Sequence, residues 1–149
     1  MKIITAELSH LDLLSPLFDA YRVFYRQTSD LAAARNFLAA RLQQKESVIF
    51  LAFEGKIPCG FTQLYPIFTS VGMRKSWLLN DLYVAASFRQ RGIAQGLIEH
   101  AKDWSRETQA AGLLLETEKE NVAGNQLYPK MGFELYDATN FYFWKNEAL

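Results

Sequence analysis

Trp77-Leu78-Leu79-Asn80-Asp81-Leu82-Tyr83-Val84, followed by the turn Arg89-Gln90-Arg91-Gly92-Ile93-Ala94, is the stretch that decides the fold. The first part is typical of a strand, and the second part is typical of a turn that opens a helix. The first N–H groups of a helix lack partners, and the helix dipole makes that end positive. Gly92 has no Cβ atom, so a ligand can approach the backbone there. The stretch therefore predicts an anion site, suited to a pyrophosphate, beside the end of a strand.

The turn does not match the common nucleotide-binding motifs. A P-loop needs Gly-Lys followed by Ser or Thr, and the sequence contains no such triplet. A dinucleotide fingerprint needs three glycines in the order G-x-G-x-x-G, which residues 92–97 do not supply. The pattern that fits is Gln or Arg, two residues, Gly, one residue, and then Gly or Ala. Arg89, Gly92 and Ala94 occupy its three defined places.

A second stretch begins with Leu113-Leu114-Leu115-Glu116-Thr117, which is typical of a buried strand. It continues through Asn121 into Leu127-Tyr128-Pro129-Lys130-Met131-Gly132-Phe133. Together the two stretches resemble the GNAT N-acetyltransferases. In that family a coenzyme A signature follows a strand, and a later strand, asparagine and short helix end in L-Y-x-K-x-G-F. The resemblance extends over nearly the whole chain, with a weaker similarity to the branch of yeast histone and polyamine acetyltransferases.

Periodicity and turn signals predict the element order β-α-α-β-β-β-α-β-α-β-β. The expected strands are 2–8, 48–53, 58–68, 74–84, 113–118, 133–136 and 141–144, and the expected third helix begins at about Gln90. The resemblance implies an α/β (α+β) fold with a mixed central sheet of about seven strands. Four helices would flank this sheet, which would be splayed between strands 4 and 5. The length of 149 residues predicts a single N-acetyltransferase domain, 1–149.

The composition excludes several classes of protein. Sixteen basic and sixteen acidic residues cancel, whereas nucleic-acid-binding proteins normally carry a basic excess. The longest apolar run, 48–53, is too short to span a membrane, and the N-terminus lacks the apolar segment of a signal peptide. The single cysteine, Cys59, cannot form an internal disulfide, which favours a reducing compartment. We therefore expect a cytoplasmic protein without a nucleic-acid or membrane partner.

The resemblance implies that the chain moves an acetyl group from acetyl-CoA directly to a primary amine. A small amine, polyamine or amino acid is the favoured acceptor. The alternatives are an acetyltransferase for a protein lysine or N-terminus, and a non-catalytic acyl-CoA-binding module. Cys59 lies outside both motifs, so no acyl-enzyme is expected.

The resemblance also implies which residues hold the coenzyme. Backbone N–H groups of the turn would contact the pyrophosphate, the strand end would pair with the pantetheine arm, and Asn121 would hydrogen-bond to it. Asn121 could instead be a helix cap. The complete set is Leu82, Tyr83, Val84, Arg89, Gln90, Arg91, Gly92, Ile93, Ala94, Gln95, Asn121 and Tyr128.

Two residues are expected to be catalytic. Tyr128 aligns with the family's general acid, since a phenol with a pKa of about 10 can protonate a leaving thiolate; core packing is its other interpretation. Pro129, which follows it, is unusual for the family and can restrain the short helix. Asp81 is the first candidate for the base, acting directly or through water. Glu116 and Glu118 are other candidates for the base.

The acceptor is expected to lie against the first two helices, their loop and the following hairpin. Aromatic side chains there could hold an ammonium by cation–π contact, or could simply form the core. The nominated residues are Phe24, Tyr25, Gln27, Gln63, Tyr65 and Asn80. No spacing of cysteines or histidines indicates a metal site. The aromatic run 141–144 would be apolar on both faces of a strand, which predicts a homodimer.

Overall fold

The structure is a computed structural model that describes residues 1–149. The chain forms two compact units, Met1–Glu116 and Thr117–Leu149, and each is described by itself. The first unit holds a five-stranded sheet in the order β1-β2-β3-β4-β5. The strands are β1 (Lys2–Thr5), β2 (Val48–Glu54), β3 (Ile57–Thr69), β4 (Arg74–Val84) and β5 (Leu113–Leu114). The first four pair antiparallel, and β5 runs parallel to β4.

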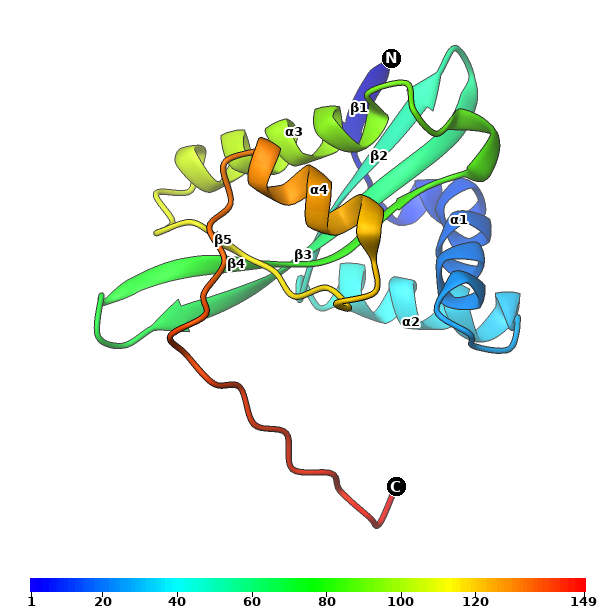
Figure 1. Ribbon diagram of the computed structural model, residues 1–149. Coiled ribbons are helices and arrows are strands. Elements are labelled where there is room, and N and C mark those ends of the chain that lie inside the picture. The colour runs from blue at the N-terminus through cyan, green and yellow to red at the C-terminus, as the bar shows by residue number, and fades with distance from the viewer. The chain divides into compact units, whose positions relative to one another are not determined.

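Helices cover both faces of this sheet (Figure 1). The helices are α1 (Leu11–Phe24), α2 (Leu31–Gln43) and α3 (Ile93–Glu107), and short 3-10 turns precede α1 and α3 at Leu8–His10 and Ala86–Phe88. Side chains alternate along β2, so Ile49 and Leu51 join the core under α1 and α2. Phe50 points the other way and packs on His100 of α3, with ring centroids 4.6 Å apart.

Two of these helices begin at residues that suit a helix start. Asp30 caps α2 by accepting a hydrogen bond from the Ala33 N–H at 3.0 Å. Gly92 precedes α3 in the left-handed conformation, with φ +76°. The third helix therefore begins at Ile93 rather than at about Gln90, because both Gln90 and Gly92 have positive φ and cannot continue a helix.

The second unit contains one helix, α4 (Val122–Lys130). The strands predicted at 133–136 and 141–144 are wrong, because residues 133–146 form no regular element. A strand exists only where a neighbour pairs with its backbone groups, and none of the five strands pairs with this segment. The mixed α/β class with four helices is confirmed, with five strands in place of about seven.

Pairing between β4 and β5 is very short. It consists of Trp77 with Leu113 and Leu78 with Leu114. Beyond Leu78, that edge of β4 has no strand paired with it, so the sheet is open as expected between its fourth and fifth strands. The residues of this open edge, 80–84, lead straight into the turn before α3.

Candidate active site

A β-bulge at Asn80 sets the geometry of β4. The register pairs Leu64 with Leu79 but Gln63 with Asp81, so Asn80 is an extra residue opposite β3. Side chains alternate across a strand, and cross-strand partners share a face. The extra residue therefore moves Asp81 to the face of the sheet that Gln63 occupies. Without the bulge, Asp81 would share a face with Leu79.

Aromatic contacts identify the two faces. Before the bulge, Trp77 packs on Trp104 of α3, with centroids 6.0 Å apart. After the bulge, Tyr83 lies 6.3 Å from Tyr21 of α1 and 6.4 Å from Phe61. Asp81 therefore faces α1, at the border of an aromatic cluster.

That aromatic cluster gathers residues from the end of α1, from β3 and from β4. Tyr21 lies at its centre, 5.1 Å from Tyr25 and 5.8 Å from Phe61 between ring centroids. Phe24 packs edge-on to Tyr25 at 5.2 Å. The structure thus brings together three residues nominated from the sequence, Phe24, Tyr25 and Tyr83. They surround Tyr21, which was not nominated.

Asp81 is a buried carboxyl, only 4% exposed. The Gln63 Nε2 group donates to Oδ2 at 2.5 Å, and Asn80 Nδ2 donates to Oδ1 at 3.0 Å. Burial raises the pKa of Asp81 above its ordinary value, and hydrogen bonds from Gln63, Tyr21 and Asn80 only partly oppose this. A carboxylate of raised pKa holds a proton more firmly than an exposed one, which suits a general base.

The turn after β4 is fixed by Arg89. Its Nε donates to the Val84 carbonyl at 3.0 Å. Its guanidinium carbon lies 5.5 Å from the centroid of the Phe24 ring and 5.8 Å from that of the Tyr83 ring. The predicted phosphate residue thus ties the turn to both the strand end and α1. Arg91 stacks on Phe88 instead, 5.3 Å from the ring centroid.

No side chain caps the start of α3, where Gly92 is the cap residue. A Cβ atom built on Gly92 would meet only the Gln95 Oε1, at 3.7 Å. No side chain caps or crowds the backbone at this helix start, as predicted. Ala94 and Gln95 lie in the first turn of α3, whereas Ile93 is 1% exposed and its side chain belongs to the core.

In the second unit, Asn121 is the cap of α4. Its Oδ1 accepts from the Gly124 N–H at 3.1 Å, and its Nδ2 donates to Thr117 Oγ1 at 2.8 Å. The capping interpretation of Asn121 is therefore what the structure shows. Tyr128 lies in α4 with its ring 5.8 Å from Phe133, and its carbonyl accepts the Phe133 N–H at 3.0 Å. Pro129 lies inside the helix, which ends one residue later.

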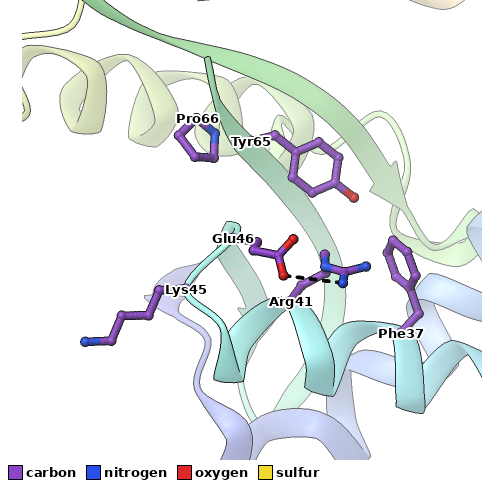
Figure 2. A pocket seen from close by; sticks show the side chains of 6 residues that line it. All are labelled: Phe37, Arg41, Lys45, Glu46, Tyr65 and Pro66. Carbon is purple, nitrogen blue, oxygen red and sulfur yellow. Dashed lines mark ion pairs between the residues drawn. The ribbon is translucent and has the colours of Figure 1, made fainter. Parts of the chain in front are cut away.

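A cavity of about 600 Å³ opens between α2 and β3 (Figure 2). Its lining residues are Phe37, Arg41, Lys45, Glu46, Tyr65 and Pro66. Burial raises the pKa of Tyr65 to about 12, with a further contribution from the Asp81 charge. Of the residues nominated for the acceptor, Tyr65 lies here, Gln63 and Asn80 contact Asp81, and Gln27 lies in the exposed α1–α2 loop.

Sequence reasoning missed Tyr21, Phe37 and Arg41. All three lie on helices, Tyr21 on α1 and the other two on α2, and their positions along those helices do not by themselves indicate a site. A usable signal was present for one pair, because Phe37 and Arg41 are four residues apart and so share a helix face. The Arg41 guanidinium carbon lies 4.7 Å from the centroid of the Phe37 ring.

Cys59 lies closer to the turn than its place in the sequence indicates. Its carbonyl accepts the Ala85 N–H at 2.9 Å, directly after the end of β4. Its thiol is buried and lies 3.4 Å from the Ala52 carbonyl oxygen. Burial raises the pKa of this thiol.

Two kinds of feature are absent from the chain. No three or more His, Cys, Asp or Glu side chains are grouped so as to hold a metal ion. No helix has both the length and the apolar character needed to cross a bilayer.

Known proteins of similar sequence and structure match this chain over most of its length. The uncharacterized N-acetyltransferase YhfO of Bacillus subtilis is 45% identical over 134 residues, which cover 90% of each chain. The crystal structure of a probable acetyltransferase superposes with a TM-score of 0.93 at 40% identity, covering 99% of each chain. An aminoglycoside N-acetyltransferase in complex with CoA shares the fold, with a TM-score of 0.82 at 20% identity over 98% and 94% of the two chains.

The acetyltransferase (GNAT) family model matches residues 12–133, which include β4, the Gly92 turn and α4. This match and the YhfO alignment bear out the resemblance drawn from the two sequence motifs. The chain belongs to the acetyltransferase (GNAT) family and is an enzyme of the acyltransferase class.

Proposed function

We propose that this chain uses acetyl-CoA to acetylate a primary amine of a small molecule, without an acyl-enzyme. The observation that carries the proposal is Asp81. Its carboxyl is buried beside a bulge in β4, has a raised pKa, and borders an aromatic cluster, in a chain of an acetyltransferase family. A group placed and tuned in this way is suited to proton transfer rather than to a surface ion pair.

Asp81 accepts the proton that the acceptor ammonium must lose. An alkylammonium has a pKa of about 10.4, so little of the amine is reactive at neutral pH without a base. Gln63 and Asn80 each donate to one oxygen of Asp81 and hold the carboxyl in place. The proton passes directly or through one water molecule.

The open end of β4 and the turn fit the coenzyme. Bound acetyl-CoA supplies an acetyl group activated as a thioester. Backbone groups of 82–84 are free of strand pairing on one side and suit the pantetheine arm. The uncapped N–H groups of 93–95, the Cβ-free Gly92 and the side chains of Arg89, Gln90 and Arg91 suit the pyrophosphate and adenosine phosphates.

Tyr128 donates a proton to the leaving thiolate in this proposal. A phenol, with an ordinary pKa of about 10, can protonate a leaving thiolate. Asn121 holds α4 through its cap and retains one amide hydrogen of Nδ2 for the pantetheine. Phe24, Tyr25, Gln27 and Tyr65 border the acceptor.

A small acceptor is favoured by the aromatic cluster that borders Asp81. Aromatic rings offer cation–π contact to an ammonium at little conformational cost.

The test is release of free thiol from acetyl-CoA, measured against small amines, polyamines, amino acids and peptides. Asp81→Asn should lower kcat/KM by about 100- to 10,000-fold, and Tyr128→Phe by about 100-fold. Matched controls are Asp103→Asn, an exposed carboxylate on α3, and Tyr136→Phe, which is 66% exposed. No turnover by the wild type with any acceptor, despite thermal stabilisation by acetyl-CoA, would favour a binding module. Full activity of Asp81→Asn would remove Asp81 as the base.

Three further features belong to the proposal. The enzyme is a single N-acetyltransferase domain, 1–149, and it is cytoplasmic, as its single cysteine favours. It is a homodimer, because Phe141, Tyr142, Phe143 and Trp144 are between 70% and 92% exposed in the chain alone. Four exposed aromatic residues in succession favour a partner surface.

A further inference from the structure

Apart from Tyr65, the side chains that line the cavity between α2 and β3 have no role in the proposed acetyl transfer. In Figure 2 the Arg41 side chain lies between Glu46 and Phe37, with Tyr65 and Pro66 on the opposite wall. The lining carries two cations, Arg41 and Lys45, and one anion, Glu46. The cavity therefore has an excess of positive charge and suits an anionic group.

Arg41 is only partly satisfied in this cavity. Its Nη2 lies 3.5 Å from Glu46 Oε1, longer than a good charge-assisted hydrogen bond. Its Nε is buried and has no hydrogen-bond partner. The Nε and Nη2 groups form one edge of the guanidinium, which is the edge that grips a carboxylate with two parallel hydrogen bonds. The Glu46 side chain is 45% exposed, so it can turn away into solvent at little cost.

The cavity adjoins the Asp81 site through β3. Tyr65 lines the cavity, and its phenol is subject to the charges of both Asp81 and Arg41. Gln63, which donates to Asp81, is two residues earlier on β3. Two strand residues span about 7 Å and point to the same face, so the two sites are separated by roughly that length.

We propose that this cavity binds the carboxylate of the acceptor through Arg41, and that the acceptor is therefore an amine carrying a carboxylate several bonds away. The inference rests on the proposed function, since it assigns the far end of the acceptor whose ammonium lies at Asp81. Lys45 adds to the positive field, and Glu46 contacts only the Nη2 end of the guanidinium edge when no acceptor is bound. An ω-amino acid of roughly four to six carbons fits the separation of the two sites.

Binding is tested without turnover. The ¹H–¹⁵N resonance of Arg41 Nε is assigned by its loss in Arg41→Lys. It is then followed while the protein is titrated with N-acetyl ω-amino acids of roughly two to six carbons and, separately, with their amides. We expect a saturable shift with the acids and none with the amides. Failure of every acid to shift this resonance, or equal shifts with the amides, would overturn the proposal.

The second test measures kcat/KM for acetylation of each ω-amino acid and of its amide. Arg41→Gln should lower kcat/KM for the acids by about 10- to 100-fold and change that for the amides by less than about threefold. Arg35→Gln is the matched control, because Arg35 is on the same helix but pairs with Asp12 at 2.7 Å. Wild-type preference for the amide in every pair would contradict the inference.

Glu46→Gln separates recognition from a structural ion pair. Removing the carboxylate that competes for Arg41 should lower KM for the acids severalfold. If the Arg41–Glu46 pair only stabilises the fold, the same change would leave KM unaltered and lower the melting temperature. If the wild type acetylates no amine but the Arg41 Nε resonance still shifts with the acids, the proposed function is refuted and the carboxylate site remains supported. If the wild type acetylates amines but the resonance does not shift, the carboxylate site is refuted and the proposed function remains supported.

Discussion

In the folded protein, burial disfavours the charged form of Asp81 relative to the protonated form. Its pKa in the folded protein is raised, chiefly by burial, so the folded state binds the proton more tightly than the unfolded chain does. This contribution to stability is fully present below the pKa of the unfolded aspartate, about 3.9, and is lost as the pH rises through the folded pKa. At neutral pH the carboxylate therefore weakens the fold it serves.

Asp81→Asn should consequently raise the urea midpoint at neutral pH while lowering activity. Gln63 can turn its amide, because its Oε1 has no partner, and then accept from the amide introduced at position 81. The gain should shrink towards zero near about pH 4, where the wild-type carboxyl is protonated. Urea unfolding at several pH values measures this, with Asp103→Asn unchanged. A lowered midpoint at every pH would show that Asp81 is a structural partner.

Local patterns in the sequence predicted where some residues lie in the fold, while the roles assigned to these residues stay predictions. Arg89, Gly92 and Asp81 occupy positions that the motif and strand ending indicate. Arg41 was not nominated because the cavity that it lines is completed by Tyr65 and Pro66 of β3, far away in sequence, and its spacing from Phe37 shows only that the two share a helix face.

At the scale of the element, the turn between β4 and α3 depends on two left-handed residues, Gln90 with φ +61° and Gly92 with φ +76°. Any side chain at Gly92 would cost about 1 kcal/mol for that conformation and would also stand where a phosphate is proposed to lie. Gly55 offers a matched comparison, since it has φ +59° in the β2–β3 turn and no atom within 4 Å of a built Cβ.

Gly92→Ala and Gly55→Ala should therefore lose similar stability, about 1 kcal/mol each. Only Gly92→Ala should weaken acetyl-CoA binding, by about tenfold. Calorimetric titration with acetyl-CoA and thermal unfolding measure the two effects. Equal acetyl-CoA affinity in the two variants would place the pyrophosphate elsewhere.

Helices and strands that are defined by turns and periodicity in the nearby sequence were predictable. Elements that depend on pairing with residues far away in the sequence were not. The β2–β3 hairpin, β4 and the helices follow from turns and periodicity. The strands predicted at 133–136 and 141–144 have suitable residues but no partner for their backbone groups. The bulge at Asn80 was also invisible, because no local pattern in the sequence shows where the pairing register of β4 shifts.

At the scale of the whole molecule, the exposed aromatics of 141–144 predict self-association. Small-angle scattering at micromolar protein should give twice the monomer mass of 17.1 kDa. Phe143→Ser combined with Trp144→Ser should give the monomer, because it removes apolar surface from the proposed contact. Val71→Ser, at a fully exposed hairpin tip, is the control. A monomeric wild type would contradict the dimer.

The folded chain should not react with thiol reagents, because its one thiol belongs to Cys59. Its thiol is fully buried and its pKa is raised, so reagents that titrate thiols have neither access to it nor a thiolate to attack. Every equivalent of colour formed with the native enzyme then comes from released coenzyme. A chain that opens exposes its one thiol, so the reagent that records turnover also counts the molecules that have unfolded.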